Sequence, residues 1–131
     1  MGSLPDDLMD GHQAMLDLQA MLKKKMLPGV PAGDVYDMAM AFVDKAGYSS
    51  SFMGAEEQRI RFIGHGVGIE LDEYPFLAKG QKIPLQANMV IALEPKLVFP
   101  GKGVVGVENT HVVTPDGLQP LTSYSDEIEI L

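Results

Sequence analysis

Two glutamates of this sequence stand directly beside apolar stretches of strand length. Glu94 follows the continuous apolar run at residues 89–93, and Glu108 follows the run at residues 104–107. A buried ionised carboxylate costs several kcal/mol unless a cation, a metal ion or several hydrogen-bond donors compensate it. The pattern therefore leaves two interpretations for Glu94: it has such a partner, or the strand ends before it and the carboxylate reaches water.

A histidine lies among glycines earlier in the chain, in the segment GHGVG at residues 64–68. Glycines in a strand mark a bulge or a close approach of backbone or ligand, which would leave the imidazole of His65 accessible. The G-x-G-x-x-G spacing of a nucleotide-binding loop is absent. Together with Glu94 and Glu108, His65 forms a nitrogen and oxygen donor set suited to Mn, Fe, Co or Zn ions, which lower the pKa of bound water.

The other two histidines have less specific patterns. His12 falls near the start of a predicted helix, where a solvated or capping role is expected. His111 follows Glu108 by three residues, so the period of two in a strand turns it to the opposite face. We expect His111 to pack behind the sheet rather than to bind a metal ion.

Helical periodicity comes first in the chain and strand-like segments follow. Apolar spacing predicts helices over residues 6–26 and about 32–46, the first capped by Asp6 or Asp7 and the second ended by Gly47. Strands are expected at the following segments: residues 60–63, 67–71, 89–94, 104–113 and 127–130. Pro95 should end the pairing of the third strand. Because helices and strands do not alternate, the class is α+β, with a helical pair at about 6–46 and an antiparallel sheet at about 59–131.

Composition excludes several classes of function. The 131 residues, 46% of them apolar, correspond to one domain, and the net charge of −8 disfavours nucleic acid or an anionic membrane surface as a partner. There is no cysteine, so a thiolate metal site is excluded. The longest apolar run is far short of the ~20 residues of a membrane helix, and the cytoplasm is the expected location.

The residues also carry the motifs of a known family. The segments are FIGHGVG at 62–68, NMVIALEP at 88–95, GVENT at 106–110 and VTPDG at 113–117, followed by Leu121 and Thr122. They resemble the ordered motifs of the pita-bread metallopeptidases, family M24, which include methionine aminopeptidase, aminopeptidase P, prolidase and creatinase. The likeness is greatest to the Xaa-Pro peptidases. It implies a truncated pita-bread fold, with two helices packed on a curved antiparallel sheet.

The resemblance implies a two-metal hydrolase with five ligands: two aspartates, one histidine and two glutamates. By motif His65 and Glu94 are ligands with a catalytic role, and Glu108 is the ligand that bridges both ions. The divalent ions would be Mn, Co, Fe or Zn. A metal-bridging hydroxide would attack the first peptide bond of a peptide substrate with proline in second position. Glu94 or Glu108 would act as general base, and analogy with the family favours Glu94.

The sequence departs from the family pattern in two places. Both aspartates are missing, because their strand hairpin would precede the first helix, and Asp6, Asp7 and Asp10 lie at a helix start instead. Residues 1–131 are thus expected to be part of a catalytic domain without its upstream hairpin and N-terminal domain, inactive alone and holding at most one weakly bound ion. Asp72 stands where many relatives have a histidine near the scissile bond, so its role in substrate binding is left open.

Three interpretations follow from these departures. The parent protein is an Xaa-Pro peptidase, or it is a non-catalytic homologue that binds a peptide or a partner protein, or the chain is a piece with no activity of its own. Since a missing half would leave strand edges and apolar surface uncovered, we also expect a homo-oligomer.

Overall fold

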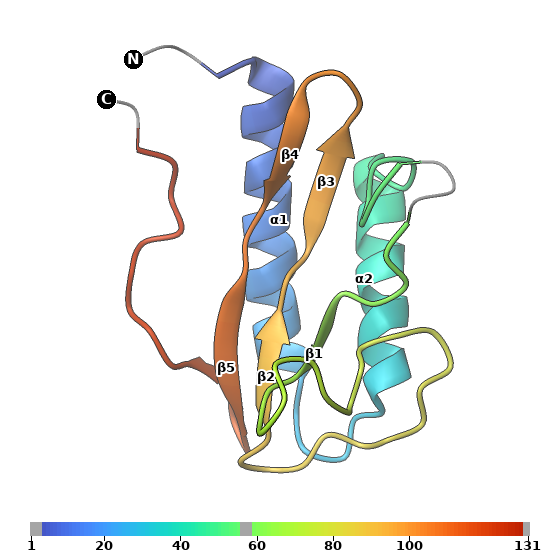
Figure 1. The fold of residues 1–131 in the computed structure, drawn as a ribbon, viewed down its shortest axis with the longest axis vertical. Helices are drawn as coiled ribbons and strands as arrows, with labels where there is room; N and C mark the ends of the chain where they lie inside the picture. The colour runs from blue at the N-terminus through green and yellow to red at the C-terminus, as the bar shows by residue number, and fades with distance from the viewer. Residues whose placement is uncertain (1–3, 56–58, 130–131) are drawn as a thin grey trace.

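The computed structural model describes residues 4–55 and 59–129. Helices α1 (Asp6–Lys25) and α2 (Ala32–Ala46) lie side by side and run in opposite directions, as the sequence predicts (Figure 1). The end of α2 is also as expected, because Gly47 adopts the left-handed conformation with φ 82°. No described helix is long and apolar enough to span a membrane.

The predicted capping of α1 is wrong. Pro5 occupies the N-cap position without a side-chain cap, and Asp6 and Asp7 lie in the first turn instead. There their negative charges interact favourably with the positive end of the helix dipole. The positive charges of the three lysines 23–25 in the last turn interact favourably with its negative end. Dipole complementarity, not a capping hydrogen bond, is what these charged residues contribute.

The strands form two antiparallel sheets. The larger sheet has the order β1-β2-β5-β6, and its strands are β1 (Gly64–Gly66), β2 (Val90–Leu93), β5 (Asn109–Thr114) and β6 (Gly117–Pro120). The smaller sheet pairs β3 (Lys96–Phe99) with β4 (Gly103–Gly106). The α+β class with an antiparallel sheet is confirmed.

Several predicted strands differ from those observed. The strands expected at 60–63 and 67–71 are absent, and β1 lies between them. Residues 67–71 form a loop in which the apolar side chains of Ile69 and Leu71 are exposed, so no core holds them in a strand. The strand expected at 104–113 is interrupted at Val107 and Glu108.

The remaining differences lie around β3, β6 and the C-terminal segment. Pro95 does end the β2 pairing, but the chain continues directly into β3 in the second sheet, which was not predicted. The strand β6 was missed as well. Residues 127–129 form no strand, and the rest of the strand expected at 127–130 lies outside the described residues.

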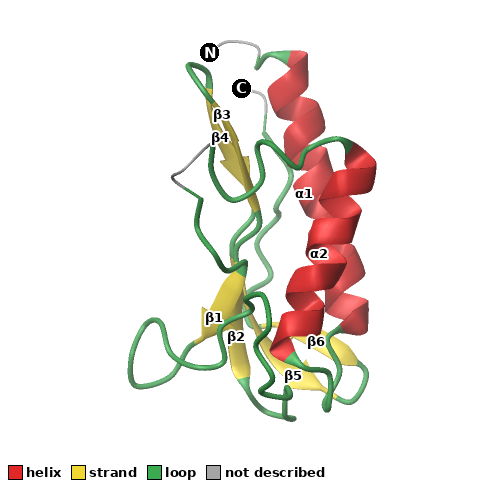
Figure 2. Cartoon of the chain, turned by 90° about the vertical axis from the view of Figure 1, so that its right-hand side faces the viewer, coloured by secondary structure: helices red, strands yellow, loops and turns green. Residues whose placement is uncertain are grey.

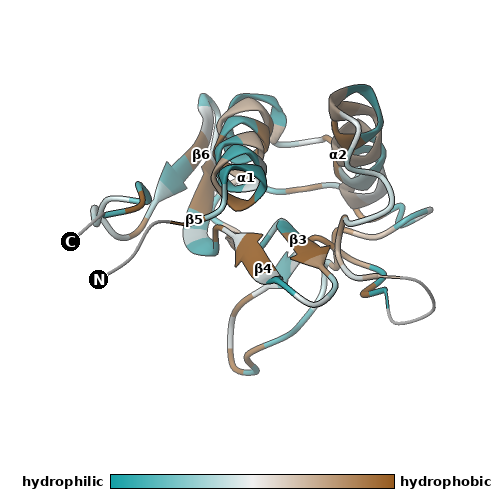
Figure 3. Ribbon diagram, turned by 90° about the horizontal axis from the view of Figure 1, so that it is seen from above, coloured by the Kyte–Doolittle hydropathy of each residue, from teal (hydrophilic) through white to brown (hydrophobic). Residues whose placement is uncertain are grey.

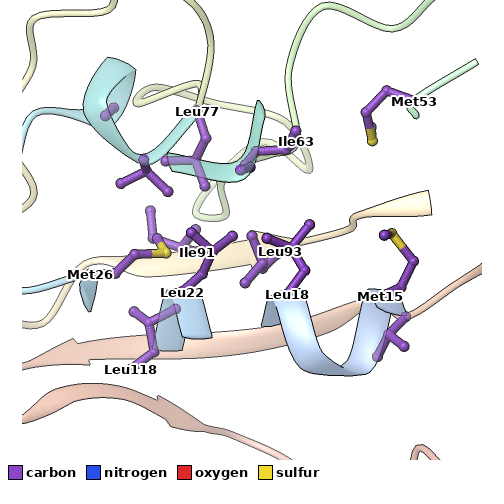
Figure 4. Close-up of a cluster of buried hydrophobic side chains, with 14 of the residues drawn as sticks. Met15, Leu18, Leu22, Met26, Met53, Ile63, Leu77, Ile91, Leu93 and Leu118 are labelled. Atoms are coloured by element: carbon purple, nitrogen blue, oxygen red, sulfur yellow. The ribbon is translucent and has the colours of Figure 1, made fainter. Parts of the chain in front are cut away.

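Both helices lie on the same side of β3 and β4 (Figure 3). The side view shows the two helices on one side of β1, β2, β3 and β4, with the loop beside β1 on the other (Figure 2). Leu18 and Leu22 of α1 meet Ile91 and Leu93 of β2 in the hydrophobic core (Figure 4). Because side chains alternate along a strand, this packing fixes which residues of β2 face away from the helices.

Candidate functional site

The sheet register brings the predicted site residues to the face away from the helices. His65 of β1 pairs with Ala92 of β2, and Ala92 pairs with Thr110 of β5. Glu94 is two residues beyond Ala92, and its backbone N–H donates to the carbonyl of Ile63, which continues the β1–β2 pairing. Paired residues share a face and alternate residues along a strand do too, so His65, Ala92, Thr110 and Glu94 lie on one face. The opposite face packs against the helices.

His65 is buried, although the glycines around it predicted an accessible ring. Its side chain is only 6% exposed, because the rings of Phe62 and Phe76 lie 6.0 and 6.5 Å from the imidazole. Nδ1 lies 3.0 Å from the carbonyl oxygen of Gly66 and donates to it. The aromatic neighbours and this hydrogen bond fix the ring, so that Nε2 points to the polar side chains of the site.

The glycines next to His65 allow a close approach of backbone, as the sequence predicts. A Cβ on Gly66 would lie 2.5 Å from the carbonyl oxygen of Tyr74, and a Cβ on Gly64 would collide with the carbonyl oxygen of Ala92. In addition, the N–H of Gly66 donates to the carbonyls of Glu73 and Pro75. The returning loop therefore packs directly over β1, and a larger residue would displace it.

Two carboxylates face Nε2 of His65. Asp72 Oδ1 lies 3.2 Å from it and Glu94 Oε1 lies 3.7 Å from it. The Asp72 side chain is 49% exposed, whereas that of Glu94 is 13% exposed. The structure thus brings together three of the four residues that the sequence singled out.

Glu94 also has a partner that the sequence analysis missed. The ammonium Nζ of Lys96 lies 2.7 Å from Glu94 Oε2. A cation two residues from a half-buried carboxylate in an extended segment lies on the same side of the chain, and this spacing could have predicted the pair. Of the two interpretations left open for Glu94, the compensating partner is present, and the strand also ends before Glu94, at Leu93, as the other interpretation held.

Glu108 differs from the prediction, because it is not buried in a strand. It is exposed, in the interruption between β4 and β5. It lines an open groove of about 170 Å³ together with Glu94 and Lys96. Glu108 and Glu94 therefore line the same groove, but Glu108 is exposed to solvent whereas Glu94 is largely buried.

The donor chemistry of these residues fits a divalent ion, since imidazole nitrogen and carboxylate oxygen are ordinary ligands of such ions. As the side chains lie, however, no three His, Asp or Glu residues among residues 4–55 and 59–129 are grouped closely enough to hold one. The described chain offers part of a ligand set.

The remaining histidines lie away from this site. His12 is not simply solvated, since its Nε2 is 2.9 Å from the carbonyl oxygen of Asp126 and fixes the C-terminal segment to α1. His111 is fully buried and pairs with Ile91 of the helix-facing side, as predicted. Asp7 forms an ion pair with Lys102 and takes no part in the site.

Comparisons with known proteins concern the family and the fold. Residues 2–115 match the model of metallopeptidase family M24. The chain is 34% identical, over 104 residues, to an Xaa-Pro dipeptidase of Lactobacillus delbrueckii subsp. lactis, covering 79% of this chain and 26% of that protein. Among solved structures, an X-Pro aminopeptidase from Thermotoga maritima MSB8 superposes with a TM-score of 0.87 at 26% identity, covering all of this chain and 35% of that one.

A prolidase from Pyrococcus furiosus gives a TM-score of 0.83 at 28% identity, covering 95% of this chain and 35% of that one. This chain thus spans about a quarter to a third of the proteins it resembles. The arrangement of two helices on an antiparallel sheet is part of the pita-bread fold of these peptidases. M24 peptidases generally depend on divalent metal ions. The chain belongs to metallopeptidase family M24.

Proposed function

We propose that this chain supplies part of the catalytic site of a metal-dependent peptidase that removes the first residue of peptides with proline in second position. The observation that carries the proposal is the approach of His65 Nε2 and Glu94 Oε1 to 3.7 Å, on the sheet face that the helices leave open. Support for the substrate comes from relatives named Xaa-Pro dipeptidase and X-Pro aminopeptidase. Their names also support a peptide as the partner of the site.

In this proposal His65, Glu94 and Glu108 are ligands of divalent ions, which would be Mn, Co, Fe or Zn. When bound, such ions polarise the peptide carbonyl and make water a stronger nucleophile at neutral pH. Glu94 acts as general base at Oε1, because the Lys96 ammonium already lies 2.7 Å from Oε2. The Lys96 contact also holds the carboxylate in one orientation toward the groove.

The chain alone is proposed to be inactive, because its described residues do not group three ligands at one point. Purified protein should hydrolyse no Xaa-Pro dipeptide with added Mn²⁺ or Co²⁺, and elemental analysis should find at most one ion per chain. Two stoichiometric ions, or hydrolysis that disappears with Glu94→Gln, would contradict this.

The proposed function is tested by joining this chain to the rest of a relative's sequence. In the Thermotoga relative, the segment equivalent to this chain covers 35% of the protein. Replacing that segment with this chain should give a metal-dependent Xaa-Pro peptidase, and Glu94→Gln in the chimera should lower kcat by at least about a hundredfold, as loss of a general base does. Glu70→Gln, an equal loss of charge on the exposed loop after β1, is the matched control.

A folded chimera that binds metal but shows no activity above its Glu94→Gln variant would contradict the proposal. The gene upstream of Met1 gives an independent test. A strand pair with two aspartates about ten residues apart is expected there, and its absence would favour a non-catalytic homologue that binds peptides.

A further inference from the structure

A row of aromatic rings leads from His65 to the surface of the molecule. The rings of Phe62 and Phe76 lie 6.0 and 6.5 Å from the imidazole, and they lie 5.3 Å from each other. Tyr74 extends the row, because its ring is 5.2 Å from that of Phe76. His65 is buried, whereas Tyr74 is 67% exposed. The row thus connects a buried residue of the candidate site with a tyrosine that is largely open to solvent.

The backbone of the loop after β1 holds Tyr74 close to this site. The N–H of Gly66 donates to the carbonyl of Glu73, and the N–H of Glu73 donates to the carbonyl of Gly66, which is the reciprocal pair of antiparallel strands. Asp72, on one side of Glu73, has its Oδ1 3.2 Å from Nε2 of His65. Tyr74 is on the other side of Glu73, so it is fixed two residues from a side chain that contacts His65.

Tyr74 is one of three exposed apolar side chains on this loop. Ile69 is fully exposed, and Leu71 is 79% exposed. Single exposed apolar residues are common on protein surfaces, because polar atoms are too few to cover them. Three of them within six residues, beside a candidate site, instead indicate a surface that a ligand covers.

A prolyl side chain has the chemistry that fits an exposed aromatic ring beside a peptidase site. It is an apolar ring, and proline-containing segments dock against aromatic side chains in several classes of peptide-binding domain. We propose that Tyr74 is a specificity-determining residue, whose ring packs against the proline of an Xaa-Pro substrate. The inference rests on the proposed function, since it assigns to Tyr74 the selection of the substrate proposed there.

The test is the binding of Ala-Pro to the 131-residue chain, followed by NMR, with Ala-Ala as the peptide that lacks the prolyl ring. Tyr74→Ala removes the aromatic ring, and Tyr74→Phe keeps the ring and removes only the hydroxyl. The matched control is Tyr124→Ala, because Tyr124 is another largely exposed tyrosine, 83% exposed, on the C-terminal segment and outside the aromatic row.

In the wild type, Ala-Pro is expected to shift the ring signals of Tyr74 and not those of Tyr124. Tyr74→Ala should raise the Kd for Ala-Pro by about fivefold, the size of effect that one ring contact has. The Kd for Ala-Ala should stay within about twofold. Tyr74→Phe and Tyr124→Ala should also leave the Kd for Ala-Pro within about twofold of the wild type, because neither removes the ring at position 74.

Each other outcome overturns the inference. Equal losses for Ala-Pro and Ala-Ala in Tyr74→Ala would place the ring against the peptide backbone, without selection of proline. An unchanged Kd in Tyr74→Ala, or an equal loss in Tyr74→Phe or Tyr124→Ala, would exclude a specific contact through the ring, and so would a wild type that binds no Ala-Pro.

Hydrolysis of Ala-Pro by the Thermotoga chimera distinguishes failure of this inference from failure of the proposed function. If any of these outcomes is found and the chimera is active, the inference about Tyr74 alone fails. If the folded chimera binds metal but is inactive, the proposed function fails with it.

Discussion

The ammonium of Lys96 lies 2.7 Å from a carboxylate oxygen of Glu94, on the other side of Pro95 in the chain. The two side chains are 27% and 13% exposed, so water screens the pair only in part. Glu94 is thereby kept at the edge of the core without an uncompensated charge. The same contact leaves one oxygen of Glu94 directed to His65.

Replacing Lys96 with Met is expected to lower the free energy of unfolding by about 1–2 kcal/mol, less than for a fully buried pair because both groups are partly exposed. Glu94→Gln in the same chain should restore most of the loss, since no unpaired charge remains. Urea unfolding measures both changes. The control is Lys102→Met, which removes the more exposed pair with Asp7 and should cost clearly less, because solvent screens that pair. A loss no larger than that of the control would contradict the role given to Lys96.

His111 makes the stability of the fold depend on pH. The ring is fully buried, and neither nitrogen has a hydrogen-bond partner within the described residues. Burial lowers the pKa of His111 below its usual 6.5, the Lys23 ammonium adds to this, and the Asn109 backbone and the Asp126 carboxylate oppose it. The unfolded chain therefore binds more protons than the folded chain below about pH 6.5.

The free energy of unfolding should accordingly fall as the pH decreases from about 6.5 toward the lowered pKa of His111. Replacing His111 with Leu removes the titrating group, so the fall between pH 7.5 and 5 should become smaller. Urea unfolding at several pH values checks this, with His12→Gln as the control because His12 is hydrogen-bonded at the surface. An unchanged pH dependence in His111→Leu would show that other groups dominate it.

The glycines around His65 should differ in their tolerance of a side chain. In Gly66→Ala the new Cβ would lie 2.5 Å from the Tyr74 carbonyl oxygen, which is backbone and cannot turn away. In Gly68→Ala the neighbour is the carboxylate of Glu73, which can change its rotamer. Gly66→Ala should therefore destabilise by about 2 kcal/mol or more, within the range for overpacking, and Gly68→Ala by clearly less. Thermal unfolding compares the two, and equal losses would contradict the packing of the loop over β1.

Periodicity predicted the parts of the fold that depend on local sequence. Both helices and strand β2 follow from apolar spacing, and the position of His111 follows from alternation along β5. The strand boundaries around Gly64–Gly66 and Lys96–Phe99 could not be predicted in this way, because they depend on which distant segment approaches the backbone. A short strand through glycines and a second sheet after Pro95 are set by tertiary contacts.

The site was predictable to a similar degree. The motif gave His65, Glu94 and Glu108, and the register places the first two together. The contact of Asp72 with His65 depends on the course of the loop after β1, and the exposure of Glu108 depends on the break between β4 and β5. Neither the path of a loop nor a break in a strand is encoded by the period of two that identified the strands.

The β4 strand has an edge that is open in the described part of the chain. β3 pairs with one side of it, and no other described strand pairs with the opposite side. Val104, at its centre, is 60% exposed. Unpaired strand edges with apolar side chains tend to pair with another chain, and a net charge of −8 opposes this only mildly because salt screens it beyond about 8 Å.

The chain is therefore expected to form a homo-oligomer through this edge, with an interface of more than about 1,000 Å² in total. Replacing Val104 with Lys puts a charge at the centre of the edge and should shift the protein toward monomer. Light scattering at tens of micromolar measures the change, and Leu121→Lys, an exposed apolar position outside β4, is the control. A wild type that is a stable monomer at that concentration would contradict this prediction, and so would two variants that behave alike. A strand edge that drives association must respond to a charge placed on it and not to a charge placed elsewhere.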